Sequence, residues 1–455
     1  MNLLFKTDSY KHSHYLQYPP GTSELFYYLS SRGGKFQTTT FFGLQAILKE
    51  YFSEPMTMEH IDQAEPRILQ HGEPFNRAGW ERVVKEHGGR IPMRIRAVAE
   101  GTTVPVNNVL MTVESTDPEL PWIPGFFESV LERVWYPMTV CTQSREMKKI
   151  VKRYLVDTSD LVDEILPSRL HDFGARGSTS GQSAAIGGLA HLVNFRGTDT
   201  MEALELAEKY YHEPMAGFSI PAMEHSTVTA WGKENEVEAY RNMLTQFNGK
   251  VFAAVSDSYD LAYAVSKLWG EKLKSEVVGN GAPVVIRPDS GDPATMVVST
   301  LKRLEEKFGS KANRKGFRVL NNVAVIQGDG IDIDSIREIL SEVKAAGFST
   351  SNVAFGSGGA LLQKVDRDTQ KVAYKASNIV YGKAASRPIF KDPVSDPGKR
   401  SMGGRLELIK SVHGDYATTT RGDMYGDTSV LQTVWENGEL LIDQKLSEIR
   451  ERAAL

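Results

Sequence analysis

The segment PVVIRPDSGDP at residues 283–293 begins as a compact apolar run and ends in charged residues and glycine. Three more segments have the same form, namely VFAAVSDSYD (251–260), VAVIQGDGID (323–332) and NVAFGSGGA (352–360). Buried parallel strands produce such runs, and a spacing of about 30 to 40 residues leaves room for a helix after each strand. The four segments therefore predict βα units, arranged either as a barrel or as a doubly wound sheet.

The stretches between these segments are predicted to be helices. Residues 294–308 and 332–346 carry apolar residues at helical spacing. Either Asp332 or Asp334 can cap the second helix, and Gly347 can end it.

In both arrangements the carboxyl ends of the strands meet at one edge, where active sites form. The GDG and GSGG turns expose backbone N–H groups there, which favours a phosphorylated ligand. The aspartates could hold Mg²⁺, orient ribose hydroxyls or stabilise a developing cation, although a single aspartate is more often a helix cap. The residues expected at this edge are Asp257, Arg287, Asp289, Gly328, Asp329, Gly356, Gly358 and Gly359.

The two ends of the chain have a different pattern of apolar and polar residues. Residues 1–160 contain alternating segments such as MRIRAVAE (93–100) and NNVLMTVES (107–115), which are typical of α+β structure. Beyond residue 370, KVAYKASNIVYGK (371–383) is predicted to be a strand. Residues 390–405 form a Pro/Gly loop that suits a polyanion or is simply a solvated surface. Its basic residues are Lys391, Lys399, Arg400 and Arg405.

Composition excludes several classes of protein. The 455 residues contain 53 Lys and Arg against 57 Asp and Glu, so a net charge of −4 disfavours nucleic-acid binding. No apolar run approaches the roughly 18 residues that span a bilayer, and the first twenty residues lack a signal-peptide core. The single cysteine, Cys141, excludes an intrachain disulfide. We expect a cytoplasmic protein with at least two structural units, because one core rarely exceeds about 300 residues.

Three further segments carry residues that could take part in chemistry. His225 lies in GFSIPAMEHSTVTAWG (217–232) at the start of a predicted helix, where Glu224 or Asp257 could orient its imidazole for nucleophilic or proton-transfer work. A capping or core histidine is the simpler interpretation. In RLHDFGARG (169–177), Phe173 and Arg176 could meet one planar ligand, although Phe173 is more often core. In TDSYKHSHY (7–15), Tyr10 either stacks on a ligand or belongs to a surface arm.

Ten motifs, taken in order, resemble the nicotinamide phosphoribosyltransferases, and the shorter loops resemble those of the bacterial members. The resemblance runs from about residue 6 to about residue 450. The motifs are TDSYKHSHYLQYPPGT (7–22), SREMKK (144–149), HDFGARG (171–177), HLVNFRGTDT (191–200), IPAMEHSTVTAWG (220–232), VSDSYD (255–260), IRPDSG (286–291), QGDG (327–330), FGSGG (355–359) and FKDPVSDP (390–397).

This resemblance implies the transfer of phosphoribose from phosphoribosyl pyrophosphate to nicotinamide, which gives nicotinamide mononucleotide and pyrophosphate for NAD salvage. The fold it implies is α/β, with a barrel-like βα domain and a mixed α/β domain formed from both ends of the chain. We expect the mixed domain at residues 1–160 and 366–455 and the barrel at 161–365. The resemblance also implies a homodimer with active sites at the interface.

The resemblance assigns roles residue by residue. Tyr10 of one subunit and Phe173 of the other would sandwich the nicotinamide ring, Asp199 would accept a hydrogen bond from the carboxamide, and Arg176 and Arg287 would lie near the ring. Asp289 would hold the ribose hydroxyls. The 5′-phosphate would bind Gly328, Asp329, Gly358 and Gly359, and the pyrophosphate would bind Arg32, Arg367, Lys375 and Lys391.

ATP and Mg²⁺ are the cosubstrate and cofactor that the resemblance implies. ATP would phosphorylate His225, with Glu224 and Asp257 orienting the ring, and Mg²⁺ would bind mainly through substrate phosphates. Some features depart from the expected pattern. Ala373 stands where a hydroxyl residue is expected near Lys375, and residues 32–41 form a shorter loop, while residues 178–183 align poorly.

Three alternatives remain open on the sequence. A nicotinate phosphoribosyltransferase of the same fold would prefer the acid, and Asp199 argues against it. A Schiff-base aldolase could use Lys375, which follows a βα array. A binding module without turnover would keep the nucleotide pocket alone.

Overall fold

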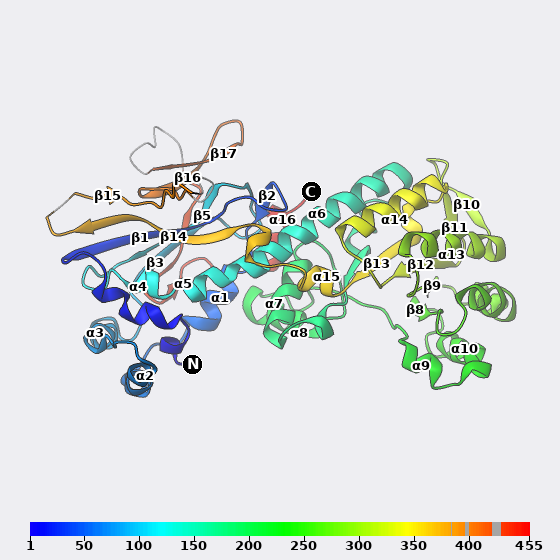
Figure 1. The fold of residues 1–455 in the computed structure, drawn as a ribbon. Helices are drawn as coiled ribbons and strands as arrows, with labels where there is room; N and C mark the ends of the chain where they lie inside the picture. Colours follow the sequence, from blue (N-terminus) through cyan, green and yellow to red (C-terminus); the bar gives the residue numbers. More distant parts are fainter. Residues whose placement is uncertain (384, 396–399, 421–428) are drawn as a thin grey trace. The chain divides into compact units, whose positions relative to one another are not determined.

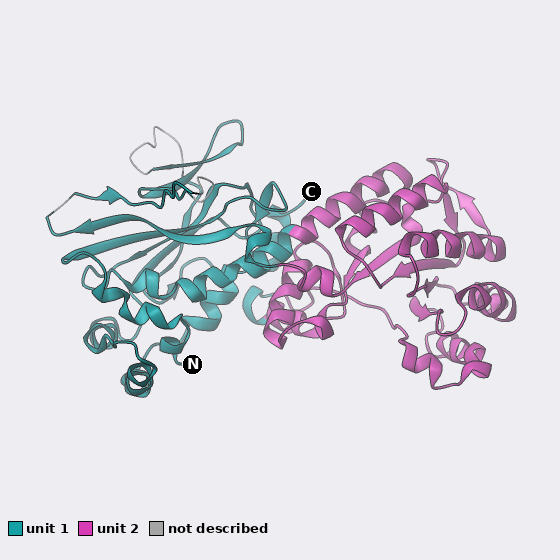
Figure 2. Ribbon diagram, viewed as in Figure 1, with its two compact units in different colours: residues 1–142, 209–212, 366–454 teal, residues 143–208, 213–365, 455 magenta. Residues whose placement is uncertain are grey.

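The computed structural model describes residues 1–383, 385–395, 400–420 and 429–455, so Lys399 of the predicted basic loop lies outside the described residues. Two compact units divide the chain (Figure 2). Unit 1 comprises residues 1–142, 209–212 and 366–454, and unit 2 comprises residues 143–208, 213–365 and 455. The first boundary falls at 142/143, inside a long helix, whereas the sequence placed it at 160/161; the boundary at 365/366 coincides with the expected one.

Unit 2 is built around a parallel sheet with strand order β7-β6-β13-β12-β9-β8, of which Figure 1 labels β8, β9, β12 and β13. Every neighbouring pair in this sheet is parallel. The four apolar runs form β8, β9, β12 and β13, so the predicted strands are confirmed. The strands are β6 (Leu170–Asp172), β7 (Gly197–Thr198), β8 (Phe252–Val255), β9 (Val284–Arg287), β12 (Val323–Gln327) and β13 (Val353–Ser357), and a separate hairpin joins β10 (Ser310–Ala312) to β11 (Arg318–Leu320).

Residues 218–222 join the two edges of this sheet. Phe218 pairs in parallel with Gly197 of the edge strand β7, and Ala222 pairs in parallel with Ala253 of the other edge strand, β8. The open sheet thereby becomes a ring whose strands follow the order of the sequence. This closure makes the unit barrel-like and decides against a doubly wound sheet.

Helices follow the strands of unit 2, as expected for βα units. Asp332 caps α14 by accepting hydrogen bonds from the backbone N–H groups of Asp334 and Ser335, and Gly347 follows its end with φ +82°. The helices are α7 (Gly181–Leu192), α8 (Met201–Tyr211), α9 (His225–Thr229), α10 (Glu236–Gln246), α11 (Leu261–Tyr263), the π-helix η7 (Ala264–Lys272), α12 (Lys274–Gly279), α13 (Pro293–Phe308), α14 (Ile333–Ala345) and α15 (Gly359–Leu362); α6 (Trp135–Thr158) contains the first unit boundary.

Unit 1 contains an antiparallel sheet with strand order β15-β14-β1-β5-β3-β18-β19. Its strands come from both ends of the chain, as predicted, and β1 pairs with β14 about 350 residues away, for example Tyr28 with Lys375. The strands are β1 (Thr22–Ser31), β3 (Met93–Ala97), β5 (Asn108–Ser115), β14 (Val372–Tyr381), β15 (Arg387–Pro388), β18 (Gln432–Glu436) and β19 (Glu439–Leu440), with small sheets of β2 (Thr38–Thr40) and β4 (Thr103–Pro105) and of β16 (Leu406–Lys410) and β17 (Tyr416–Thr420).

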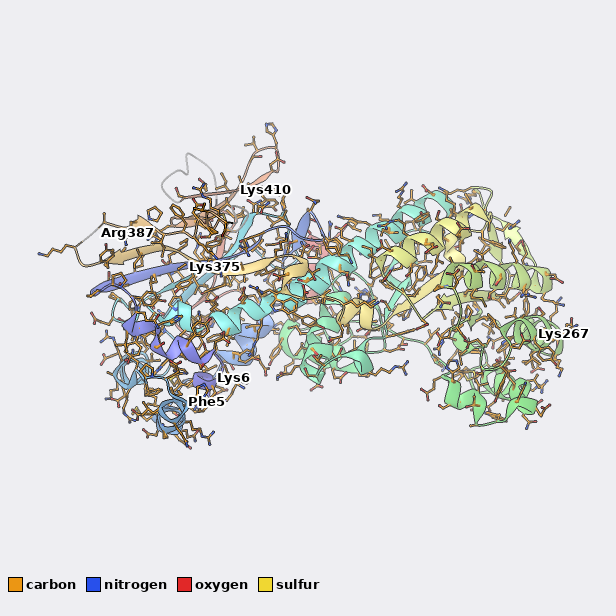
Figure 3. All side chains as sticks on the ribbon, in the orientation of Figure 1. Phe5, Lys6, Lys267, Lys375, Arg387 and Lys410 are labelled. Atoms are coloured by element: carbon orange, nitrogen blue, oxygen red, sulfur yellow. The ribbon has the colours of Figure 1, made fainter. Side chains whose placement is uncertain are left out.

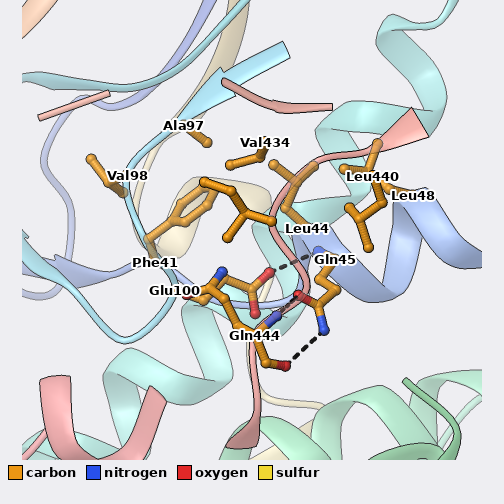
Figure 4. A pocket seen from close by; sticks show the side chains of 11 residues that line it. Phe41, Leu44, Gln45, Leu48, Ala97, Val98, Glu100, Val434, Leu440 and Gln444 are labelled. Carbon is orange, nitrogen blue, oxygen red and sulfur yellow. Dashed lines mark hydrogen bonds between the residues drawn. The ribbon is translucent and has the colours of Figure 1, made fainter. Parts of the chain in front are cut away.

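The helices of unit 1 include one whose first turn is held by a distant carboxylate. The N-cap of α1 is Gly43, which has no side chain, and the buried carboxylate of Glu100 accepts the backbone N–H of Gln45 at 2.7 Å (Figure 4). The cavity beside it is only about 10 Å³, room for about one water, so we exclude it as a ligand site. The helices are α1 (Leu44–Tyr51), α2 (Met58–His71), α3 (Arg77–His87), α4 (Ile123–Phe126), α5 (Glu128–Leu131) and α16 (Leu446–Arg452).

Among the helices of the described residues, none combines the length and the apolar character that crossing a membrane requires.

Candidate active site

The polar residues predicted at the strand ends lie together at the carboxyl edge of the barrel in unit 2. Each follows directly from the end of a parallel strand, which places it at the same rim as its neighbours. Phe173 follows β6, Asp199 follows β7 and Asp257 follows β8. Arg287 is the last residue of β9, and Asp289 comes just after it. Gly328 and Asp329 follow β12, and Gly358 and Gly359 follow β13.

The Phe173 ring lies across the mouth of the barrel. Its backbone N–H donates to the carbonyl of Ser357 at 2.9 Å, which ties the loop after β6 to β13. A Cβ placed on Gly356 would lie 1.9 Å from the ring, so only glycine leaves room for it. The ring packs against an apolar cluster inside the barrel that includes Val285 and Ile326. These contacts give the rim an apolar floor with one aromatic face.

Asp199 is an exposed carboxylate on the same rim. Its Oδ1 accepts a hydrogen bond from the hydroxyl of Ser219, which belongs to the segment that closes the barrel. The nearby His171 is largely buried, and burial lowers its pKa although the charge of Asp199 opposes the shift. The His171 and Phe173 ring centroids are 6.1 Å apart. Asp199 and Phe173 therefore follow the neighbouring strands β7 and β6, and His171 lies near both.

Arg287 and Asp289 form an ion pair at the end of β9, with 3.5 Å between Nε and Oδ1. Burial raises the pKa of Asp289, and the positive charge of Arg287 opposes that rise. The buried amide of Gln327 donates to the carbonyl of Asp329 at 3.1 Å and reaches the carbonyl of Asp289 at 3.5 Å. Gln327 therefore links the two loops that carry these aspartates.

His225 is the first residue of α9, and its Nε2 lies 3.0 Å from Oδ1 of Asp257. The other oxygen of Asp257 accepts the backbone N–H of Ser290 at 2.7 Å and also its hydroxyl. Burial alone would raise the pKa of Asp257, but the hydrogen bonds from Ser290 and His225 outweigh it and lower that pKa. Glu224 has a different partner, because its carboxylate accepts the hydroxyl of Ser226. The geometry thus pairs His225 with Asp257.

The two glycine turns end β12 and β13. Gly330 has φ +67°, a conformation that favours glycine, and Gly359 begins the four-residue helix α15. A Cβ on Gly359 would meet no atom within 4 Å, so packing within the protein does not demand glycine there. Arg176 is exposed in the 3-10 turn at Ala175–Gly177, close in sequence to Phe173.

Five of the predicted site residues belong to unit 1. Tyr10 is 52% exposed, and Lys391 is exposed in the loop after β15. Arg32 follows β1, and its Nε is buried without a hydrogen-bond partner. Arg367 and Lys375 both act on the carboxylate of Glu132. Burial raises the pKa of Glu132, and these two cations oppose that rise.

Ala373 lies opposite Ser30 in the β1–β14 pair, and the Ser30 hydroxyl is buried without a partner. A hydroxyl at position 373 would lie on that face of the sheet. Lys375, labelled in Figure 3, lies on the same strand. Its Nζ donates to the carbonyl of Tyr374 at 2.9 Å.

Sequence reasoning missed three residues at the rim, namely Ser219, Ser290 and Gln327. Each is a neutral polar residue within a segment quoted above, and its type alone signals no specific role. Only the geometry reveals them, because their partners lie on other strands of the barrel. Within the described part of the chain, no three His, Cys, Asp or Glu side chains converge as a metal site.

Comparison with known proteins identifies the family. The model of the nicotinate phosphoribosyltransferase (NAPRTase) family matches residues 168–439. The chain belongs to the nicotinate phosphoribosyltransferase family. The N-terminal domain model of nicotinamide phosphoribosyltransferase also matches, over residues 2–95. This member of the family is therefore a phosphoribosyltransferase, and the family's barrel model covers the rim described above.

Two bacterial nicotinamide phosphoribosyltransferases match this chain along nearly the whole length of both proteins. The nicotinamide phosphoribosyltransferase of Xanthomonas campestris pv. campestris (strain 8004) is 54% identical over 459 residues, covering 99% of this chain and 98% of the relative. The nicotinamide phosphoribosyltransferase of Acinetobacter baylyi (strain ATCC 33305 / BD413 / ADP1) is 30% identical over 100% of this chain and 97% of its own length.

Solved structures share the fold. The nicotinate-nucleotide pyrophosphorylase of Pyrococcus furiosus superimposes with a TM-score of 0.64 at 15% identity, covering 99% of this chain and 94% of that chain. Human nicotinic acid phosphoribosyltransferase gives a TM-score of 0.55 at 16% identity, covering 98% and 92%. These likenesses confirm the predicted fold of a barrel-like domain with a mixed α/β domain.

The fold and the family membership argue against two of the alternatives, the Schiff-base aldolase and the binding module without turnover. A Schiff-base aldolase would need Lys375 at the barrel, but Lys375 lies on an antiparallel strand of unit 1. A binding module without turnover would not need the phosphoribosyltransferase family's barrel with its ion-paired rim.

Proposed function

We propose that the enzyme transfers phosphoribose from phosphoribosyl pyrophosphate to nicotinamide, giving nicotinamide mononucleotide and pyrophosphate in NAD salvage. The carboxylate of Asp199 beside the Phe173 ring carries this proposal. A carboxylate accepts a hydrogen bond from a carboxamide NH₂ and repels the carboxylate of nicotinate. The Xanthomonas relative, named nicotinamide phosphoribosyltransferase at 54% identity, supports the same choice of base.

The base binds between an aromatic face and a fixed acceptor. Phe173 offers its ring as one wall, Arg176 lies in the turn after Phe173, and Arg287 ends β9. The Ser219 hydroxyl occupies one oxygen of Asp199 and leaves the other to the carboxamide. The ring nitrogen of nicotinamide attacks with its own lone pair, so the site needs no general base.

The reaction forms an N–C bond at C1′ of the ribose while the bond from C1′ to pyrophosphate breaks, with the electron pair leaving on pyrophosphate. Positive charge develops on the ribose ring, and the carboxylate of Asp289 stabilises it. The glycine turns at residues 328–330 and 358–359 offer backbone N–H groups to the 5′-phosphate. Open space beside Gly359 supports the close approach of such a group.

The departing pyrophosphate requires cations. Arg32, Arg367, Lys375 and Lys391 supply them across the interface of the proposed dimer, and the unpartnered Nε of Arg32 supports this role. Asp257 and Asp289 already have partners at the rim, so Mg²⁺ fits best as an ion carried by the substrate phosphates. When bound, Mg²⁺ neutralises negative charge on the pyrophosphate. We further propose a cytoplasmic homodimer in which the exposed Tyr10 of one copy completes the base site of the other.

His225 couples ATP to this reaction. Asp257 accepts a hydrogen bond from Nε2–H, which leaves the lone pair of the neutral imidazole on Nδ1. Nδ1 can then attack the γ-phosphorus of ATP, forming a P–N bond as the bond to ADP breaks. Ser290 holds Asp257 from its other side and so fixes the orientation of the pair.

One experiment tests the proposed function. Purified protein is mixed with phosphoribosyl pyrophosphate, Mg²⁺ and either nicotinamide or nicotinate, with and without ATP, and the products are identified by mass spectrometry. Nicotinamide mononucleotide that increases with ATP is the expected result. Nicotinate mononucleotide as the main product would favour the rival base, and no product from either base would overturn the proposal.

Gly356→Ala is expected to displace the Phe173 ring and to raise the KM for nicotinamide. A Cβ 1.9 Å from the ring forces it out of the mouth, and a lost aromatic contact of about 0.5 to 1.5 kcal/mol corresponds to about 2- to 12-fold. Steady-state kinetics with varied nicotinamide measure the change. Gly279→Ala is the matched control, because a Cβ there meets no atom within 4 Å. An unchanged KM for Gly356→Ala would remove Phe173 from the base site.

Asp199→Asn is expected to reduce discrimination against nicotinate by about tenfold, the effect of removing one repulsive charge worth about 1.4 kcal/mol. The ratio of kcat/KM for the two bases measures it. Asp334→Asn makes the same chemical change on the exposed first turn of α14 and should leave the ratio alone. A ratio that does not move for Asp199→Asn would place base selection elsewhere.

A further inference from the structure

Asp172 is a buried carboxylate at the end of β6 that has no part in the steps described above. Its side chain is 0% exposed, and it immediately precedes Phe173. Its Oδ1 accepts the backbone N–H of Gly174 at 2.7 Å, so the side chain closes a tight turn around Phe173. A Cβ on Gly174 would lie 2.5 Å from Leu362 Cδ1 and 3.0 Å from this oxygen, which leaves the turn no room to relax.

The main chain of Asp172 holds the second base-binding residue. Its carbonyl accepts the backbone N–H of Asp199 at 2.9 Å. Asp172 also pairs with Thr198 in the parallel register of β6 and β7. One residue therefore positions Phe173 through its side chain and Asp199 through its backbone.

The carboxylate of Asp172 is close to its ionisation point at neutral pH. Burial raises its pKa to about 6, and the hydrogen bond from Gly174 opposes the rise. The titratable groups that act on it are Asp199 after β7 and Glu202 of α8, and both raise its pKa further. The facing elements α7 and β13 bring Gly188 and Ser357, which do not titrate in this range.

The hydroxyl of Thr200 lowers the pKa of the Asp172 carboxylate. Oδ2 of Asp172 and the Thr200 hydroxyl are both buried, and neither makes a hydrogen bond of good geometry. The Thr200 hydroxyl is nevertheless close enough to lower the pKa of Asp172 against the effect of burial. Removing this hydroxyl therefore shifts the ionisation of Asp172 to higher pH.

We propose that Asp172 is a positioning residue: its backbone holds Asp199, and its side chain, while ionised, holds the turn that carries Phe173 in the geometry that binds the nicotinamide ring. This inference rests on the proposed function, because it assigns the two residues to one base. A charged acceptor makes a shorter and stronger hydrogen bond to the Gly174 N–H than a neutral one does. Protonation weakens that bond, the turn loosens, and the base binds less well.

The first test is the pH dependence of the KM for nicotinamide, together with its equilibrium binding by calorimetry. For the unmodified enzyme, we expect the KM and the Kd for nicotinamide to rise several-fold as the pH falls from about 8 to about 5. The plot of each constant against pH should change slope near pH 6. Asp172→Asn keeps the acceptor oxygen but loses the charge. Its KM for nicotinamide is expected to be about tenfold higher and independent of pH in this range, with the KM for phosphoribosyl pyrophosphate little changed.

Thr200→Val is the second variant, because it changes the ionisation of Asp172 without changing the carboxylate. We expect the break in the KM profile to move to higher pH. Thr300→Val is the matched control, since the Thr300 hydroxyl is also buried without a partner but lies on α13. Thr300→Val should leave the break where it is. If Asp172 had a merely structural role, Thr200→Val would not move the break either.

Thermal unfolding gives a readout that does not depend on turnover. Because burial raises the pKa of Asp172, its contribution to stability is fully present below the unfolded value of about 4 and is lost as the pH rises through about 6. Asp172→Asn is therefore expected to melt at a higher temperature than the unmodified enzyme at pH 8 and to lose this advantage near pH 4.

The outcomes are distinguishable. A flat KM profile in an enzyme that makes nicotinamide mononucleotide would overturn the role of Asp172 and leave the proposed function intact. An Asp172→Asn variant that melts earlier at every pH would also overturn it, because the carboxylate would then be needed for folding alone. No product from nicotinamide at any pH would instead overturn the proposed function.

Discussion

Asp289→Asn is expected to lower kcat/KM for phosphoribosyl pyrophosphate by about 10²- to 10³-fold, the usual effect of removing one group that stabilises transition-state charge. The carboxylate lies at the end of β9 beside Arg287, where burial raises its pKa. The Asp289 side chain is 24% exposed, so solvent screens its charge only in part and the charge acts on a cationic ribose. An amide of the same shape keeps the contacts to ribose hydroxyls but loses the charge.

Steady-state kinetics with varied phosphoribosyl pyrophosphate measure this effect. Asp292→Asn is the matched control three residues away, since Asp292 caps α13 and asparagine caps helices equally well. We expect the control to keep full activity. The raised pKa also predicts that kcat/KM of the unmodified enzyme falls on the acid side, where Asp289 takes up a proton. A loss smaller than tenfold for Asp289→Asn would assign the ribose charge to another group.

His225→Ala is expected to abolish the stimulation by ATP, so that the rates with and without ATP become equal. The variant lacks the imidazole that Asp257 and Ser290 hold in one orientation. Nicotinamide binding should persist, because the proposed base site lies on the loops after β6 and β7. The expected ratio of the two rates is about one, whatever the stimulation in the unmodified enzyme.

Two measurements check this prediction. The rate of nicotinamide mononucleotide formation is recorded with and without ATP, and acid-labile phosphate on the protein is followed after incubation with ATP. His413→Ala, an exposed histidine in the turn between β16 and β17, makes the same change outside the site and should retain both signals. If ATP still stimulates His225→Ala, the coupling residue is not His225.

The strands of the barrel could be predicted from the sequence because burial on both faces demands unbroken apolar runs. The segment that closes the barrel could not. Residues 218–222 read FSIPA, with a proline and no long apolar run, and they act as a strand only because Gly197 and Ala253 present unpaired edges to them. Closure is therefore a property of the assembled sheet.

In the candidate site, too, some features could be predicted from the sequence and others only from the structure. Asp257 and Glu224 were equally good partners for His225 on the sequence, and Glu224 even lies next to it. In the structure Glu224 accepts a hydrogen bond from Ser226, while Asp257 reaches His225 from the adjacent strand of the barrel. Neighbours on a chain often point to different sides, whereas neighbours across a sheet can face each other.

The sequence by itself determined the strand and helix pattern of the barrel, the family, and the rim residues that carry charge or glycine. Those features are local, because burial, capping and turn formation act within a few residues of the chain. The tertiary structure decided the barrel closure, the His225–Asp257 pair and the roles of Ser219, Gln327 and Asp172. These depend on which side chains meet across strands, and hydrogen bonds and ionisation respond to distances that only the folded chain sets.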